Sequence, residues 1–409
     1  MSDLAPAGGR TGWLNRNVLA IGVADLFADF NYEMVLAVLP LFLTAGLGAP
    51  VFAVGVVEGV ADGSSAVVKL FSGWYSDRIG WRRHLATGGY VATVAGFALV
   101  AIVSAWPQVI LARAVAWVGR GARQPIRNAL LAASVGRPDL GKAFGFHEAM
   151  DTLGALLGPT AAFALLATGH GFRDVFWLAI VPGIAAVLLF GLLPRDPRPK
   201  PAGGRPPWEP LPRRYWQLIA AVALFGAGDF ATAFFTLRAA EMLKPELSAP
   251  AATSGAVAFY LVQNLVGSVA SFPGGWLADR LGKVYVLSAG YLSFVVACLV
   301  ALAGHGPVAV AVLAIPVGLR SPLVNATESS LTSSLVAERL HGTAFGVLNA
   351  VNGAGDLISS LIVGALWSTL GGPAGLLFGG ALGLAGTVLL LFLRPSSKGR
   401  GGHQTVPAG

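Results

Sequence analysis

Charged side chains are scarce in this chain. Lys, Arg, Asp and Glu make up 12% of its 409 residues, compared with about 25% in an average soluble protein. In contrast, 55% of the residues are hydrophobic. Apolar runs follow one another with short polar breaks, and each approaches the roughly 20 residues that cross a bilayer. The composition therefore excludes an ordinary soluble globular protein and indicates an integral membrane protein.

Cysteine is nearly absent as well. The chain has one, Cys298, so no disulfide can form within it and cysteine usage says nothing about the redox compartment. The sequence contains no metal-ligand spacing and no nucleophile–base set. The segment 120–123 (Arg-Gly-Ala-Arg) lacks the Gly-Lys-Ser/Thr and the preceding strand of a phosphate-binding loop. We therefore expect neither an enzyme, nor a cofactor, nor a bound metal.

The apolar runs predict an all-α integral membrane protein with 12 transmembrane helices. Helices are expected because the runs are too long and too uniformly apolar for barrel strands, whose two faces alternate. The predicted spans are 17–45, 50–72, 84–104, 107–131, 143–167, 174–194, 215–242, 251–273, 284–303, 307–331, 343–367 and 373–394.

Basic residues in the loops predict the orientation. If both termini are cytoplasmic, nineteen loop and tail Lys and Arg face the cytoplasm, whereas Arg173 and Lys244 face outward. Cytoplasmic loops carry such an excess, which accounts for the net charge of +8 without a nucleic-acid partner. We expect a monomeric, multi-pass protein of the inner or plasma membrane.

A segment rich in Pro, Gly and Arg divides the chain near its middle. It predicts four parts, of which the linker adjoins anionic lipid headgroups. They are an N-terminal six-helix bundle at 1–194, a cytoplasmic linker at 195–214, a C-terminal six-helix bundle at 215–394 and a disordered cytoplasmic tail at 395–409.

A charged motif occurs once in each predicted half. The second span is followed by Gly73-Trp-Tyr-Ser-Asp77-Arg78-Ile-Gly80-Trp-Arg82-Arg83, and the eighth by Gly275-Trp-Leu-Ala-Asp279-Arg280-Leu-Gly282-Lys283. Three further matches keep the same order: Ala28-Asp29-Phe30 with Gly228-Asp229-Phe230, Arg123-Gln-Pro125-x-x-Asn128 with Arg320-Ser-Pro322-x-x-Asn325, and Ala143-Phe-Gly145 with Ala344-Phe-Gly346. The repeat indicates two six-helix bundles related by a pseudo-twofold axis along the membrane normal.

With these motifs the chain resembles the major facilitator superfamily of secondary transporters along essentially its whole length. The first charged motif matches that family's signature Gly-x-x-x-Asp-Arg-x-Gly-x-Arg-Arg at every defined position. Gly154-x-x-x-Gly158-Pro159 is similar to the motif of the family's antiporters, including bacterial drug:proton antiporters, although Ala162 stands where a further Gly is usual. The resemblance implies two bundles that rock about a central site.

The resemblance also implies a role for the charged motif. In the family, its Asp latches the two halves in the outward-open state and releases them during the cycle. A loop that is merely basic would need neither this Asp nor the two glycines. The expected latch residues are Gly73, Asp77, Arg78, Gly80, Arg82, Arg83, Gly275, Asp279, Arg280 and Gly282.

Ionisable residues inside the predicted spans indicate where the mechanism lies. Each costs about 2.5–3.5 kcal/mol at the bilayer centre, so these groups must pair with one another or line a wet cavity. The bases are Lys69, Arg113, Arg120, Arg123, Arg127, Arg238 and Arg320. The acids include Asp25, Asp29, Glu33, Glu58, Asp62, Glu148, Asp151, Asp229, Glu328 and Asp356.

Several of these acids are candidates for proton coupling. Asp25, Asp29 and Glu33 recur every four residues and share a helical face. A carboxyl group in an apolar pocket holds its proton more tightly and can load and release it as a cavity changes sides. The proton-coupling candidates are Asp29, Glu33, Asp62 and Asp229. For each, a structural ion pair is the alternative.

Arginines form a stripe in the fourth predicted span. Arg120, Arg123 and Arg127 are expected to form salt bridges with Glu148 and Asp151, because a short loop joins the fourth and fifth spans. The neighbouring histidine, at 147, is a candidate proton relay, although a lone histidine is more often a packing residue. Arginines can instead bind a substrate carboxylate or phosphate. The substrate-cavity candidates are Arg120, Arg123, Arg238, Arg320, Asn128, Asn325, Gln263, Asn264 and Asn352.

The sequence thus predicts a proton-coupled secondary transporter that moves a small molecule by alternating access. The antiporter-like motif favours efflux of an amphipathic compound. The buried arginines favour an alternative, a proton symporter that imports an organic anion or a metal chelate. A transport-inactive receptor or scaffold could keep the same fold. It would be expected to lose the acids of the spans, which this chain retains.

Overall fold

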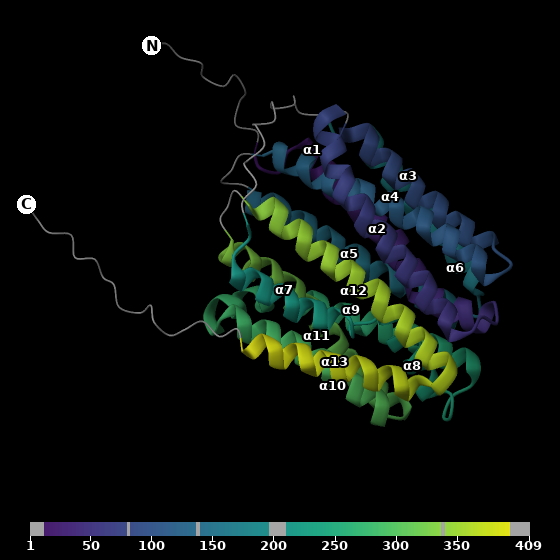
Figure 1. Cartoon of the computed structure of the whole chain (residues 1–409). Helices are drawn as coiled ribbons and strands as arrows, with labels where there is room; N and C mark the ends of the chain where they lie inside the picture. Colours follow the sequence, from purple (N-terminus) through teal and green to yellow (C-terminus); the bar gives the residue numbers. More distant parts are fainter. Residues whose placement is uncertain (1–11, 80–81, 136–139, 196–209, 337–339, 393–409) are drawn as a thin grey trace, which may run out of the picture.

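The computed structural model describes residues 12–79, 82–135, 140–195, 210–336 and 340–392 (Figure 1). These residues form helices and contain no strand, which confirms the all-α prediction. The first half contains α1 (Arg16–Leu41), a short π-helix η1 (Phe42–Gly46), α2 (Val51–Ile79), α3 (Arg82–Ile102), α4 (Trp106–Ala133), α5 (Leu140–Ala167) and α6 (Phe172–Leu192). The second contains α7 (Arg213–Gly226), α8 (Thr232–Leu243), α9 (Ala249–Leu281), α10 (Lys283–Ala303), α11 (Gly306–Leu335), α12 (His341–Leu370) and α13 (Gly372–Leu391).

The helices follow the twelve predicted spans closely. Nine described helical segments are long and apolar enough to cross a membrane. They lie in α1 with η1, α2, α3, α5, α6, α10, α11, α12 and α13. Three of the twelve predicted spans are not among these nine segments. Two of them correspond to α4, which carries four arginines, and to α9, which is 33 residues long and includes most of the second charged motif. The seventh consists of the short helices α7 and α8, so twelve membrane crossings stay a prediction.

The seventh predicted span, 215–242, is not one continuous helix. It breaks at residues 227–231, between α7 and α8. Two serines of α12 satisfy backbone groups that the break leaves without helical partners. The Ser359 hydroxyl donates to the Asp229 carbonyl oxygen at 2.9 Å, and the Ala231 N–H donates to Ser360 Oγ at 3.3 Å. A broken helix at membrane depth needs such partners. The matching segment of the first half lies inside the continuous helix α1.

The sequence predicts that the charged motifs lie in the loops after the second and eighth spans, but the structure extends the preceding helices into both motifs. Helix α2 runs on to Ile79 and α9 to Leu281, so most of each motif is helical. The second motif turns at Gly282, whose φ of 99° lies in the left-handed region that glycine tolerates. The side chains of Asp77, Arg78, Arg82 and Asp279, the surroundings of Gly73 and Gly275, and all of Gly80 lie outside what the structure describes, as do the linker at 196–209 and the tail from 393.

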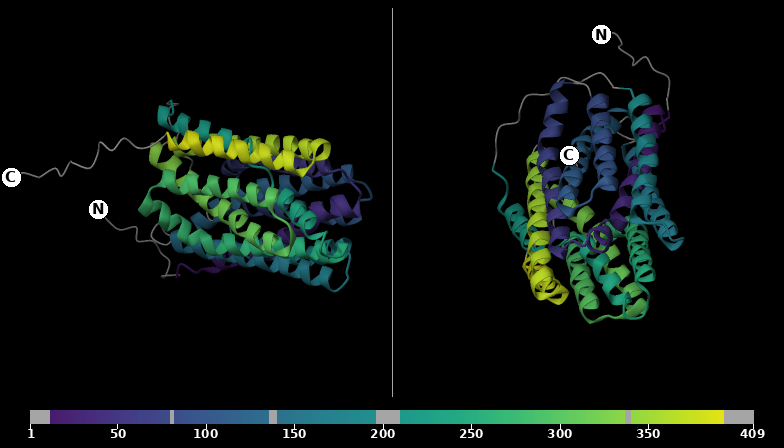
Figure 2. Two further views of the ribbon diagram at one scale, coloured as in Figure 1. Left: turned by 90° about the horizontal axis from the view of Figure 1, so that it is seen from below. Right: turned by 90° about the vertical axis from the view of Figure 1, so that its right-hand side faces the viewer.

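The two halves have corresponding helix contacts. In the first half α3 packs on α4 and α6, and α2 packs on α4. In the second half α10 packs on α11 and α13, and α9 packs on α11. The halves meet through α2 with α12 and through α5 with α9. The helix axes are roughly parallel to one another, and α1 begins and α13 ends at the same end of the body (Figures 1 and 2). We call this end the terminal end.

Glycines allow the two halves to meet closely away from the terminal end. A methyl group added at Gly55 of α2 would lie 3.1 Å from the Ser360 carbonyl carbon and 3.3 Å from the Cα of Gly364, both on α12. One at Gly59 would lie 2.9 Å from Leu357 Cδ1. Near the start of α2, the Phe52 N–H donates to Ser368 Oγ at 2.7 Å. Small residues let helix backbones approach in this way.

Candidate functional site

A central cavity lies between the halves. Its volume is about 660 Å³, and α1, α2, α4 and α12 supply its walls. Residues near the terminal end of the helices, such as Asn128 and Phe345, line it, so it extends toward that end. A deeper chamber of about 240 Å³ reaches the α7–α8 break. Both are lined by Tyr32, Asp62, Trp117 and Asp356.

One carboxylate of the first half is held by the second half. Glu33 of α1 accepts a hydrogen bond from the Tyr260 hydroxyl at 2.8 Å and another from the Asn264 amide at 3.2 Å, both to Oε2. Tyr260 and Asn264 belong to α9. The Asn264 amide also donates to the Ala155 carbonyl of α5 at 3.4 Å. The contact therefore joins three helices across the boundary between the halves.

The wall of the first half combines acids, arginine and tryptophan. Arg113 is fully buried and pairs with Glu58 at 2.7 Å, and its guanidinium lies 3.4 Å from the centre of the Trp117 ring. The Trp117 indole N–H donates to Asp62 Oδ1 at 2.8 Å. Glu58 is thus neutralised by a cation, whereas the described partner of Asp62 is an uncharged donor.

Two basic side chains line the main cavity. The Arg120 guanidinium lies 3.8 Å from the centre of the Tyr32 ring, a cation–π contact. Lys69 is exposed in the same cavity. Among the described residues neither Arg120 nor Lys69 forms an ion pair. Their positive charges are therefore available to a substrate or to the acids of the cavity.

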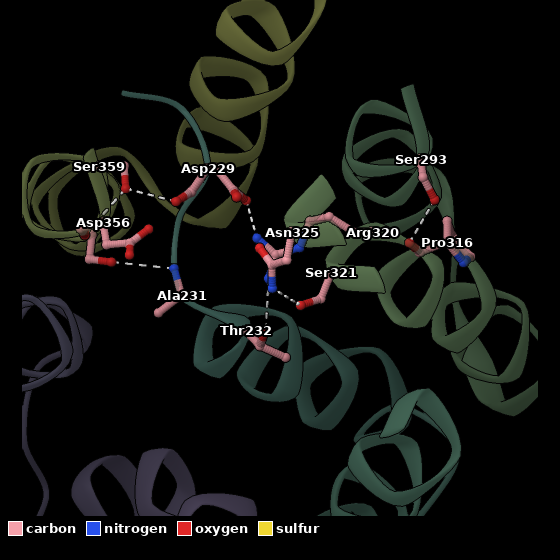
Figure 3. A network of polar contacts seen from close by, with 11 residues as sticks. Asp229, Ala231, Thr232, Ser293, Pro316, Arg320, Ser321, Asn325, Asp356 and Ser359 are labelled. Atoms are coloured by element: carbon pink, nitrogen blue, oxygen red, sulfur yellow. Dashed lines mark hydrogen bonds and ion pairs between the residues drawn. The ribbon is translucent and has the colours of Figure 1, made fainter. Parts of the chain in front are cut away.

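The wall of the second half centres on an ion pair at the helix break (Figure 3). Arg320 of α11 pairs with Asp229 and also donates to Thr232 Oγ1 at 3.2 Å. Asp356 of α12 lies beside this group in Figure 3, and no ion pair of Asp356 is found within the described part of the chain. The arrangement gives the deeper chamber one neutralised acid and one acid without a paired cation.

A second polar cluster lies in the first half, outside both chambers. Asp25 is buried and pairs with Arg127 at 2.9 Å and with His147 Nε2 at 2.8 Å, and it accepts a hydrogen bond from the Tyr90 hydroxyl. His147 Nδ1 is 3.6 Å from Asp151. Possible ligand atoms of Asp25, His147 and Asp151 lie within 4.8 Å of one another. However, the Arg127 guanidinium already balances Asp25, which opposes binding of a metal cation.

This cluster corrects two expectations. Arg127 pairs with Asp25 of α1 rather than with Glu148, which is exposed. His147 lies between two carboxylates and is not an ordinary packing residue. Spacing along α4 correctly put the arginines on one helix, but it did not identify the neighbouring helix that supplies the acid.

The predicted substrate residues divide into two groups. Arg120, Asn128, Arg320 and Asn352 line a chamber. The other five line neither chamber. Arg123 lies over the Tyr90 ring, and Arg238 bonds to Glu241 and to the Ala301 carbonyl oxygen. Asn325 is exposed and bonds to Ser321, whereas Gln263 and Asn264 bond to each other.

The proton-coupling candidates also occupy different surroundings. Asp62 and Asp229 line a chamber, and Glu33 joins the halves. Asp29 packs toward α5, where a methyl group added at Gly154 would lie 3.0 Å from its Cβ. Of the expected latch residues, Arg83 donates to the Pro194 carbonyl at 3.4 Å, and Arg280 is exposed.

Aromatic lining residues were missed from the sequence. The chambers are lined by Tyr32, Trp117, Tyr260 and Phe345. Tyr32 and Trp117 could have been found in the sequence, because each lies within one helical turn of a charged residue in a predicted span. The acid Glu241 was missed because it ends its predicted span. It pairs with Arg238 at 3.1 Å and accepts from the Trp367 indole at 3.2 Å.

Comparison with known proteins identifies the family. The sequence profile of the Major Facilitator Superfamily matches residues 21–260 and 234–406. The chain belongs to the Major Facilitator Superfamily. It is therefore a multi-pass membrane protein and a secondary transporter that works by alternating access, not an enzyme.

Relatives in this superfamily are similar along most of their length. An uncharacterised transporter of the superfamily type from Methanocaldococcus jannaschii is 27% identical over 388 residues, which cover 93% of this chain and 95% of that protein. An uncharacterised protein from Mycobacterium tuberculosis is 30% identical over 371 residues, 86% and 87% of the two chains. The quinolone resistance protein NorA of Staphylococcus aureus is 23% identical, covering 92% and 96%.

Solved structures support the superfamily fold. The nucleoside transporter NupG superposes with a TM-score of 0.76 and 13% identity, covering 92% of this chain and 98% of that one. The peptide transporter PepTSo gives 0.75 and 14%, covering 92% and 97%. At this identity the likeness concerns the fold alone.

Proposed function

We propose that this transporter is driven by protons and that Glu33 carries the coupled proton. The observation behind this is the contact of Glu33 with Tyr260 and Asn264 across the two halves. Both bonds end on Oε2. A charged carboxylate accepts hydrogen bonds about twice as strongly as a neutral carboxyl, so binding of a proton weakens this contact. Proton binding and the contact between the halves are then thermodynamically coupled.

Asp62 is the second proton-coupling candidate. It lines both chambers, and its described partner is the neutral Trp117 indole. Asp229 ranks below it, because Arg320 stabilises the charged form of this carboxylate and opposes protonation. Asp29 ranks last because it lines neither chamber and, unlike Glu33, forms no hydrogen bond to the second half among the described residues.

We infer that the substrate is a small amphipathic compound exported in exchange for protons. The chambers are lined by the aromatic residues Tyr32 and Trp117 beside the carboxylates of Asp62 and Asp356. Gly154 and Gly158 of the antiporter-like motif pack closely on α1, the helix that carries Glu33. The similarity to NorA, named as a quinolone resistance protein, supports the same direction. The basic terminal end then faces the cytoplasm.

A second candidate is import of an organic anion together with protons. Arg120 and Lys69 line the main cavity without an ion pair among the described residues. Such cations suit a carboxylate or phosphate. The two candidates differ in the direction of proton movement that accompanies the substrate.

Flux in proteoliposomes tests both proposals. A fluorescent amphipathic dye is added to vesicles that hold an imposed pH gradient. Under antiport, the added dye dissipates a gradient that is acid on the opposite side, whereas a symported substrate dissipates a gradient that is acid on its own side. Glu33→Gln should abolish dye accumulation driven by the pH gradient while dye exchange at equal pH persists.

Glu148→Gln is the matched control, since Glu148 is an exposed acid of α5. It should transport as the wild type does. Proton-driven accumulation that survives in Glu33→Gln, or that fails equally in Glu148→Gln, would contradict the assignment of Glu33. If accumulation survives there but is lost in Asp62→Asn, the proton carrier is Asp62 instead.

A further inference from the structure

A third cavity lies within the second half, apart from the central chambers. It has a volume of about 450 Å³ and lies at the terminal end, between the first turns of α7 and α10 and the last turns of α11. Arg214 of α7 and Lys283 of α10 line it, together with Leu218, Leu335 and Phe392. It adjoins the second charged motif, whose Gly282 and Lys283 line it, but none of the residues proposed above to carry the proton or bind the substrate lines it.

The cavity is positively charged at its rim and apolar inside. No acid is among the described residues that line it. The Lys283 ammonium donates to the Ser330 carbonyl oxygen at 2.8 Å, which fixes one cation at the rim. The N-termini of α7 and α10 lie at this end and contribute positive partial charge, whereas the C-terminus of α11 contributes negative partial charge. The net positive charge of the cavity therefore comes from Arg214 and Lys283.

Two exposed aromatic side chains, Tyr285 and Phe392, line the cavity, and Trp216 precedes the lining residue Gln217 in α7. Trp216 is 50% exposed, Tyr285 is 53% exposed and Phe392 is 82% exposed. In membrane proteins, tryptophan and tyrosine gather at the level of the lipid headgroups. The cavity therefore opens at the depth where a headgroup ends and an acyl chain begins.

We propose that this cavity binds one anionic phospholipid, with its phosphate between Arg214 and Lys283 and an acyl chain along Leu218 and Leu335. Basic pockets between helices on the cytoplasmic side suit anionic headgroups. The chain's own C-terminal segment is a poor occupant on charge grounds, because residues 393–409 contain three Lys or Arg and no acid. A zwitterionic lipid fits the apolar part but leaves the two cations without a net countercharge.

Native mass spectrometry of the purified full-length protein tests this proposal. The detergent-solubilised protein is titrated with dioleoyl phosphatidylglycerol, with dioleoyl phosphatidylcholine or with inorganic phosphate. We expect one phosphatidylglycerol bound in preference to phosphatidylcholine. The double variant Arg214→Gln, Lys283→Gln should bind it about 30-fold more weakly, because each basic residue near an anionic surface contributes on the order of fivefold.

The matched control is Arg195→Gln, Arg213→Gln, which removes two basic residues of the same end that do not line the cavity. It should bind phosphatidylglycerol and unfold without added lipid as the wild type does. The Arg214→Gln, Lys283→Gln variant loses the Lys283 bond to Ser330 and should unfold at a slightly lower temperature, still in one cooperative transition. Equal binding of the two lipids, or unchanged affinity in the Arg214→Gln, Lys283→Gln variant, would overturn the proposal. Competition by millimolar phosphate would assign a free-anion site instead.

Discussion

Replacing Gly55 with alanine should shift the transporter toward the conformation in which the end opposite the termini is open. The added methyl group would lie 3.1 Å from the Ser360 carbonyl carbon and 3.3 Å from the Gly364 Cα. The atom nearest to the added methyl group is the Ser360 carbonyl oxygen, which it would overlap. Carbon atoms pack best at about 3.5–4.0 Å, and relief of the closer overlap with this oxygen requires α2 and α12 to separate by about an ångström. Overpacking costs about 1–3 kcal/mol. Because this cost falls on the closed contact, the equilibrium should shift by roughly 5- to 150-fold.

A cysteine in the deeper chamber reports this equilibrium. Ala233 of α8 lines that chamber, and the chain's own Cys298 is buried and gives little background. In the Ala233→Cys protein, the rate of alkylation by an impermeant maleimide from the outer side measures the population open to that side. Gly55→Ala should raise this rate by the same factor as the equilibrium constant.

Gly88→Ala is the control for this experiment, since a methyl group there would meet no atom within 4 Å. It should leave the alkylation rate of Ala233→Cys unchanged. The reasoning is refuted if Gly55→Ala and Gly88→Ala give the same alkylation rate and the same unfolding temperature. That result would mean that the contact of α2 with α12 does not hold the outer end closed.

Three other substitutions test separate features. Arg320→Leu leaves Asp229 without its ion-pair partner and should lower the free energy of unfolding by about 3–5 kcal/mol. Adding Asp229→Asn to this variant should recover part of the loss, measured as the unfolding temperature. Ser359→Ala removes the hydrogen bond to the Asp229 carbonyl at the helix break and should lower the free energy of unfolding by about 1 kcal/mol. Asp77→Asn should slow turnover at near-normal expression, as measured by dye flux, and full activity would count against a latch role for Asp77.

The sequence was sufficient to predict the helices and their pairing into two halves. Membrane helices are recognised by local properties, apolar length and short polar breaks, so their existence and order could be predicted. The ends of α2 and α9 were placed seven and eight residues too early, because these helices continue into the charged motifs. The repeated motifs then related the halves to each other. The superfamily assignment rests on the same motifs, and the match to residues 21–260 and 234–406 confirms it.

The partners of the charged residues could not be predicted in the same way. Spacing showed that Asp25 and Glu33 share a face of α1, but the neighbours of that face come from distant helices. Arg127 reaches Asp25 from α4, and Tyr260 reaches Glu33 from α9. The break after α7 was also invisible locally, because its backbone groups are satisfied by serines more than a hundred residues later in the chain.

The interruption between α7 and α8 distinguishes two halves that otherwise match. A continuous rod such as α1 transmits a tilt from one end to the other, whereas two short pieces joined by residues 227–231 can pivot independently. Movement of the outer piece, α8, therefore does not require the inner piece to follow. A duplicated protein built this way has one half with a continuous first helix and one half whose corresponding segment is hinged.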